Sequence, residues 1–140
     1  MTGALELIEV SVDYHRGGQP VHALDSVSLA IGRSESVAVM GPSGCGKSTL
    51  LGVLALTIPP PSGSVLVNGV PAPSSPDGRA RTRNRLLGLI PQSGAVIDHL
   101  SVLANVSLPL EYSRPRTRRR VRHERARQAL ADVGIGWAEA

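Results

Sequence analysis

Phenylalanine is absent from this chain of 140 residues, which has two tyrosines, one tryptophan and a single cysteine, Cys45. A chain with one cysteine cannot form an internal disulfide, and proteins without disulfides are usual in a reducing compartment. The longest nearly apolar run, residues 50–58, is far shorter than the roughly 18 residues that a membrane-spanning helix needs. The first residues lack the basic start and apolar stretch of a signal peptide. We therefore expect a cytoplasmic protein.

Lysine is also scarce, since fourteen of the fifteen basic residues are arginines and the only lysine is Lys47. The formal net charge of the chain is +4, but residues 114–127 alone hold eight arginines and one glutamate. The rest of the chain is therefore slightly acidic. This distribution indicates one basic segment and no general affinity of the domain for nucleic acid.

The only lysine lies in a glycine-rich run, Gly41-Pro42-Ser43-Gly44-Cys45-Gly46-Lys47-Ser48-Thr49. The run fits the phosphate-binding pattern G-x-x-x-x-G-K-[ST], in which glycines let several backbone N–H groups point at one anion. Lys47 can place its charge on the β- and γ-phosphates, and the Ser48 hydroxyl can bind the Mg²⁺ that bridges them. An apolar run at residues 36–40 and a helical pattern at residues 47–56 flank the loop. The sequence therefore predicts a strand, a phosphate loop and a helix that bind a nucleotide.

The residues before position 92 predict mainly strands. Apolar and polar residues alternate in residues 8–14 and 27–31, which predicts an antiparallel β-layer. Residues 36–40 and 86–90 are apolar without alternation, as is typical of buried central strands. Asn68-Gly69 predicts a type I′ hairpin, and a charged stretch from Arg79 to Arg85 a short helix.

The residues after Gln92 predict helices. Ser101 is the expected N-cap of a first helix, which Pro109 is expected to end. A second helix is expected over residues 116–133, with Gly134 as its C-cap. Its apolar face is predicted to consist of Ala126, Ala129, Leu130 and Val133.

These motifs resemble the nucleotide-binding domain of ABC transporters, above all bacterial exporters of the lipoprotein-releasing and macrolide-efflux type. The resemblance rests on residues 41–51, 61–69 and 100–110 and extends along nearly the whole chain. It implies an α/β fold, a P-loop NTPase core with an N-terminal antiparallel β-layer and the start of an α-helical subdomain. Residues 1–92 would form the N-terminal part of the ATP-binding core and residues 93–140 the beginning of the helical subdomain.

The resemblance also implies the roles of individual residues, with ATP and Mg²⁺ as cofactors. Tyr14 would stack on adenine, and Gln92 would contact Mg²⁺ and the attacking water, which makes Gln92 and Lys47 the catalytic candidates. Ser48 and Gln92 would be metal ligands. The remaining nucleotide contacts would come from Gly41, Pro42, Ser43, Gly44, Cys45, Gly46 and Thr49.

The sequence departs from the family by what it does not contain. It has no signature like Leu-Ser-Gly-Gly-Gln and no apolar strand that ends in Asp-Glu, and its four histidines all precede the place of the family's switch histidine. Residues 95–99 look like an acidic strand only superficially, because the following glutamate is missing. We therefore expect an incomplete domain, as a fragment, a truncation or half of a split protein, that binds MgATP and does not hydrolyse it alone.

The resemblance implies three partners: a transmembrane permease subunit, a second ATP-binding domain in a head-to-tail dimer, and, for a split protein, a downstream polypeptide. The protein would then lie at the inner face of the cell membrane.

Two alternatives stay open. The chain could be another P-loop phosphotransferase whose arginines in residues 114–127 hold a substrate, or an arginine-rich module for nucleic acid or lipid, although nucleic acid is not an expected partner. A GTPase is not expected, because a base-reading Asn-Lys-x-Asp motif would need a second lysine.

Overall fold

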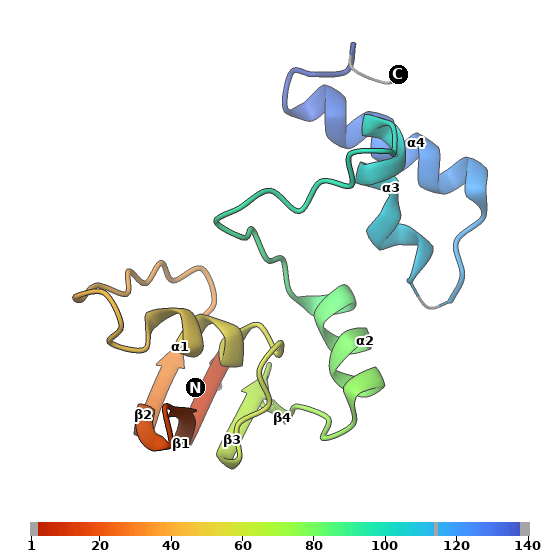
Figure 1. Ribbon diagram of the computed structural model, residues 1–140. Coiled ribbons are helices and arrows are strands. Elements are labelled where there is room, and N and C mark those ends of the chain that lie inside the picture. The colour runs from red at the N-terminus through yellow and green to blue at the C-terminus, as the bar shows by residue number, and fades with distance from the viewer. Residues whose placement is uncertain (1–2, 114, 138–140) are drawn as a thin grey trace. The chain divides into compact units, whose positions relative to one another are not determined.

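The computed structural model describes residues 3–113 and 115–137, which fall into two compact units, unit 1 (Met1–Leu87) and unit 2 (Gly88–Ala140). Unit 1 holds β1 (Leu5–Arg16), β2 (Gln19–Ile31), α1 (Lys47–Leu54), β3 (Ser62–Val67), β4 (Val70–Pro71) and α2 (Pro76–Leu86) (Figure 1). Unit 2 holds α3 (Val102–Glu111) and α4 (Arg119–Asp132). The predicted domain boundary after Gln92 lies inside unit 2, and that boundary stays a prediction.

The four strands of unit 1 form one sheet in the order β2-β1-β3-β4, and every neighbouring pair is antiparallel. The predicted antiparallel β-layer is therefore confirmed. The strands are longer than predicted, because β2 already begins at Gln19, eight residues before the alternating pattern starts at Val27. Pairing with β1 extends β2 through residues whose own pattern is not strand-like. Asn68 and Gly69 both have positive φ, 51° and 76°, as the predicted type I′ turn requires.

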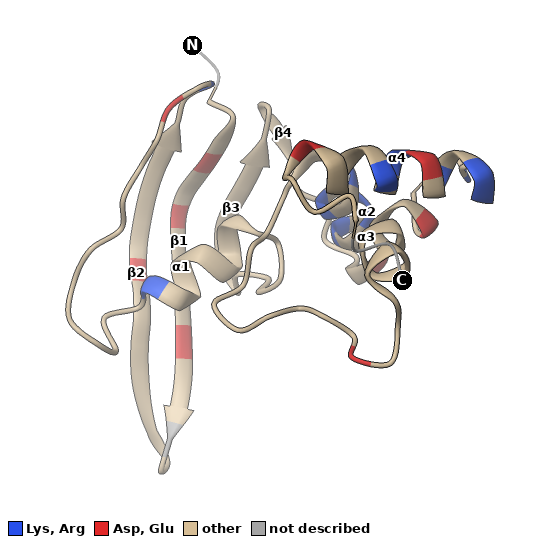
Figure 2. Ribbon diagram, turned by 90° about the horizontal axis from the view of Figure 1, so that it is seen from above, with Lys and Arg blue, Asp and Glu red and all other residues tan. Residues whose placement is uncertain are grey.

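The core of unit 1 lies between α1 and one face of the sheet (Figures 1 and 2). Its buried residues come from the strands, from α1 and from the turn after α1: Leu7, Val10, Val12, Leu24, Val53, Leu54, Leu56, Val65 and Val67. Each fully buried aliphatic side chain stabilises the fold by about 1.5–3 kcal/mol relative to an exposed one. This packing anchors α1, and with it the loop that precedes it, to β1 and β2.

The prediction of buried central strands at residues 36–40 and 86–90 is wrong. Residues 36–40 are irregular, and the Met40 side chain is 88% exposed. Residues 87–90 follow α2 as irregular chain, and Ile90 is 95% exposed. An apolar run becomes a central strand only when neighbouring strands supply hydrogen bonds on both sides. Among the described residues, neither segment pairs with a strand.

In unit 2, α3 begins as predicted, because the Ser101 hydroxyl caps the helix by accepting from the Ala104 N–H at 3.2 Å. The prediction that Pro109 ends this helix is wrong, since α3 continues to Glu111 with Pro109 inside it. Proline removes one backbone hydrogen bond and crowds the carbonyl four residues earlier, which a helix with only two residues left can accommodate.

The helix α4 packs against α3 and buries Ala126 and Leu130, as predicted. Ala129 and Val133 are exposed, so the predicted apolar face is only half correct. Gly134 ends the helix with φ 79°, and its N–H donates to the Ala131 carbonyl at 2.9 Å. These features confirm the predicted C-terminal glycine. None of the helices in the described ranges has both the length and the apolar character to span a bilayer.

A candidate nucleotide site

The phosphate loop, residues 41–46, joins the irregular segment 36–40 to α1. Gly41, Gly44 and Gly46 all have positive φ, at 152°, 82° and 94°. Gly46 is the N-cap of α1, where no side chain caps the backbone and no acidic residue lies in the first turn. The first N–H groups of a helix lack acceptors within the helix and carry the positive end of its dipole. The start of α1 is therefore suited to bind an anion such as a phosphate.

Each glycine of the loop is needed for a different physical reason. A Cβ atom on Gly46 would lie 2.2 Å from the Ala23 carbonyl oxygen in β2, and one on Gly41 would lie 2.8 Å from Cys45 Sγ. At Gly44 a Cβ atom would meet nothing within 4 Å, so only the backbone conformation favours glycine there. The pattern of glycines in the sequence did not identify Ala23, because a contact through a backbone carbonyl leaves no trace in the residue type.

The Lys47 ammonium lies over the loop. Its Nζ donates to the carbonyl oxygens of Gly41 at 2.9 Å and Pro42 at 2.6 Å, and lies 3.6 Å from Cys45 Sγ. Ser48 is exposed on the first turn of α1, whereas Thr49 is only 8% exposed. The Lys47 ammonium and the Ser48 hydroxyl are thus accessible at the loop. A nucleotide role for Thr49 stays a prediction.

Tyr14 lies in β1 opposite Val21 of β2, and its side chain is 44% exposed. It lies two residues after the buried Val12, and the register of β1 against β2 shifts between Val12 and Asp13. Ala23, which approaches Gly46, is two residues from Val21 in β2. The partly exposed ring is available for stacking on a base, and this role stays a prediction.

Gln92 belongs to unit 2, where it lies exposed in an irregular segment, whereas the phosphate loop belongs to unit 1. Its contact with Mg²⁺ and water therefore stays a prediction. Within the described ranges, no group of three or more histidine, cysteine, aspartate or glutamate side chains could hold a metal ion.

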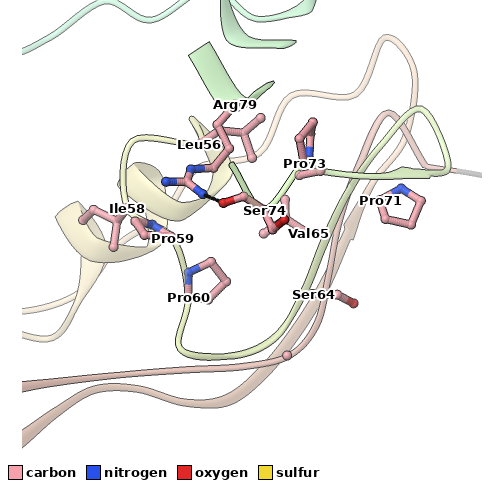
Figure 3. A pocket seen from close by; sticks show the side chains of 12 residues that line it. Leu56, Ile58, Pro59, Pro60, Ser64, Val65, Pro71, Pro73, Ser74 and Arg79 are labelled. Atoms are coloured by element: carbon pink, nitrogen blue, oxygen red, sulfur yellow. Dashed lines mark hydrogen bonds between the residues drawn. The ribbon is translucent and has the colours of Figure 1, made fainter. Parts of the chain in front are cut away.

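A cavity of about 250 Å³ lies elsewhere in unit 1, and no residue of the phosphate loop lines it. Prolines form much of its wall, as Figure 3 shows for Pro59, Pro60, Pro71 and Pro73. Its one charged side chain, Arg79, donates to the backbone carbonyl of Ser74. The cavity therefore has a largely apolar lining and lacks the cluster of donors that phosphates require.

A glycine-rich loop that leads into an uncapped helix, with a lysine over the loop, defines a P-loop nucleotide-binding domain. The ABC transporter family matches residues 24–139. The chain belongs to this family, as its motifs predict.

The relatives and solved structures support the same family and fold. The lipoprotein-releasing system ATP-binding protein LolD of Bordetella pertussis is 40% identical over 137 residues, which are 97% of this chain and 58% of the relative. The macrolide export ATP-binding/permease protein MacB of Salmonella choleraesuis is 38% identical over 96% of this chain and 21% of its own length. The ATP-binding cassette MJ0796, in a dimeric structure bound to ADP and Pi, matches with a TM-score of 0.83 and 30% identity. That match covers 96% of this chain and 60% of the cassette chain, so this chain spans well under two thirds of these relatives.

Proposed function

We propose that the chain is the ATP-binding part of an ABC transporter and binds MgATP through residues 41–49 to energise transport. The observation that carries the proposal is the loop itself, with Lys47 Nζ beside the carbonyls of Gly41 and Pro42 at the uncapped start of α1. Bound phosphates would accept from Lys47 and from the first N–H groups of α1, and Ser48 would bind the Mg²⁺. Hydrogen bonds to charged groups contribute about 1.5–3 kcal/mol each.

The Lys47→Ala substitution tests this proposal. Isothermal titration with ATP and Mg²⁺ should show at least about a tenfold weaker Kd, because one charge-assisted contact is lost. Arg85→Ala is the matched control, since it removes one positive charge from an exposed position on α2 and should leave the Kd unchanged. A Kd that is the same in the parent and in Lys47→Ala would contradict the assignment of the phosphate loop.

The names of the relatives support the proposed partners. MacB is an ATP-binding/permease protein, and MJ0796 forms a dimer. We propose that this chain likewise works with a transmembrane permease subunit and a second ATP-binding domain in a head-to-tail dimer. The protein would then be cytoplasmic and peripheral to the inner face of the cell membrane.

We further propose that the chain does not complete ATP hydrolysis by itself. A P-loop ATPase needs an acidic ligand for Mg²⁺ and a group that orients the attacking water. Gln92 and Lys47 are the catalytic candidates, and the sequence contains no apolar strand ending in Asp-Glu. The missing groups would come from the part of the relatives that this chain does not span, whether in the same polypeptide or in a downstream one.

A further inference from the structure

Five arginines of unit 2 are exposed and form no hydrogen bond or ion pair through their side chains with any residue in the described ranges. These residues, here called the arginine cluster, are Arg116, Arg118, Arg119, Arg120 and Arg125. Among the described residues, none of the five forms an ion pair. Three arginines of α2 differ, because Arg79 donates to the Ser74 carbonyl, Arg81 pairs with Asp77 and Arg83 donates to the Leu56 carbonyl. The arginine cluster therefore contributes little to the fold that the structure shows.

The segment that carries the arginine cluster is held in place by other residues. The Ser113 hydroxyl donates to the Leu110 carbonyl at 2.7 Å and lies 3.2 Å from the Thr117 hydroxyl. Arg122, whose side chain is 18% exposed, donates to the Thr117 carbonyl at 3.0 Å and pairs with Glu111 at 3.6 Å. The end of α3 thus lies against the first turns of α4, beside the residues that carry the arginine cluster.

The position of the arginine cluster is electrostatically unfavourable within the protein alone. Arg118, Arg119 and Arg120 occupy the N-cap and the first turn of α4, where no acidic residue and no side-chain cap is present. Positive side chains at this end repel the helix dipole and one another. Figure 2 shows basic residues, in blue, at the N-terminal end of α4. A surface of fixed negative charge would remove this repulsion.

We infer that the arginine cluster docks onto the anionic lipid headgroups of a membrane surface. Two neighbouring side chains favour a bilayer, because Tyr112, at the end of α3, is 70% exposed and Val121 of α4 is 41% exposed. Tyrosine, arginine and scattered aliphatic side chains are the composition of protein surfaces that bind the membrane interface. The inference rests on the proposed function, which places the protein beside a membrane permease. A basic cluster on such a protein adds affinity for the anionic leaflet.

Co-flotation of the 140-residue chain with vesicles in a density gradient tests the inference, because protein bound to lipid rises with the vesicles whereas aggregated protein does not. We expect binding to phosphatidylglycerol vesicles, no binding to phosphatidylcholine vesicles, and weaker binding at high salt. The triple variant R118Q/R119Q/R120Q should bind phosphatidylglycerol about a hundredfold more weakly, since each basic residue near the surface contributes roughly fivefold in affinity. The matched control R33Q/R81Q/R85Q removes the same charge from exposed positions outside the arginine cluster and should bind like the parent.

A single variant keeps the test independent of the stability of α4. Arg116→Glu lies before the helix and should weaken binding to phosphatidylglycerol roughly twentyfold. Equal binding of either cluster variant and the parent would overturn the inference, as would equal binding to both lipids. Tighter binding to a duplex DNA oligonucleotide than to phosphatidylglycerol vesicles, lost in the triple variant, would assign the surface to nucleic acid instead. Lys47→Ala should bind vesicles like the parent. Loss of nucleotide binding and loss of vesicle binding can therefore be told apart.

Discussion

At the scale of single residues, the phosphate loop depends on contacts that leave no room for a side chain. Gly46 combines φ 94° with a carbonyl oxygen of Ala23 that an added Cβ would approach to 2.2 Å. Gly44 has a similar φ of 82° but open space around it. The two positions therefore separate the effect of backbone strain from the effect of packing against β2.

We predict that Gly46→Ala destabilises unit 1 more than Gly44→Ala. The left-handed conformation costs a non-glycine residue about 1–2 kcal/mol at either position, and only at Gly46 is the overlap with Ala23 added. Urea denaturation followed by circular dichroism measures both free energies of unfolding. Equal losses in the two variants would mean that the contact with β2 does not constrain the loop.

Tyr14 permits a test of base stacking. Tyr14→Ala should weaken the binding of adenine nucleotides by about 1–3 kcal/mol, whereas Tyr14→Phe keeps the ring and should be nearly neutral. Titration calorimetry with ATP gives both values. If Phe weakens binding as much as Ala does, the hydroxyl and not the ring makes the contact.

Cys45 is an exposed free thiol inside the loop, 3.6 Å from Lys47 Nζ. Alkylation by N-ethylmaleimide should be fast in the free protein and slow with MgATP, because the bound phosphates would cover the loop. Mass spectrometry follows the extent of labelling. The Lys47→Ala variant serves as the control and should show little protection by MgATP, and protection that persists there would place the nucleotide elsewhere.

At the scale of elements, Asn105 joins α3 to the segment before it. Its Nδ2 donates to the carbonyls of Ile97, Leu100 and Ser101, each at 3.1 Å, and its Oδ1 accepts from the Ile97 N–H at 2.8 Å. The side chain therefore links α3 to the backbone of residues 97–101, where the Ser101 carbonyl also accepts from the Asn105 N–H and the Ile97 carbonyl from the Leu100 N–H. The residue fixes the start of α3 together with the Ser101 cap.

We predict that Asn105→Ala lowers the stability of unit 2 by about 1 kcal/mol, because partly buried backbone groups lose their partners. Asn105→Asp keeps an acceptor for the Ile97 N–H but loses the donors. Hydrogen exchange should therefore show an exposed Ile97 amide in the alanine variant and a protected one in the aspartate variant. An Ile97 amide that stays protected in the alanine variant would show that another group holds the segment.

At the scale of the whole molecule, two apolar segments remain exposed within the described ranges. Met40, Leu89 and Ile90 are 88%, 52% and 95% exposed, in the same runs that the sequence marks as central strands. Exposed apolar surface and unpaired backbone favour association with another chain. A chain that spans 58% of its relative LolD is expected to need further residues to cover these runs.

We predict that the purified 140-residue chain is prone to aggregate and shows no ATP turnover above a Lys47→Ala control, although nucleotide binding stays measurable. A polypeptide that corresponds to the remainder of the relatives should restore both solubility and hydrolysis when it is coexpressed. Light scattering and phosphate release measure the two properties. A monomeric chain that melts cooperatively and hydrolyses ATP alone would contradict this prediction, and would direct attention to Asp98 and His99.

The sequence by itself determined the parts of this protein whose chemistry is local. The loop around Lys47, the turn at Asn68-Gly69, the cap at Ser101 and the glycine after α4 depend on residue type and spacing, and the structure has each of these features where it was predicted. Nearest-neighbour sterics and hydrogen bonds decide such features, so the pattern of residues is sufficient.

Tertiary structure alone decided the features that depend on a distant partner. Pairing with β1 lengthened β2 beyond its alternating pattern. The lack of strand neighbours among the described residues left segments 36–40 and 87–90 irregular, although their composition favours burial. The Ala23 carbonyl that excludes a side chain from Gly46 is likewise a contact across the fold. A strand gains its hydrogen bonds from other segments of the chain. Its own residues therefore indicate only that it can be buried, and its pairing in the fold determines whether it is buried.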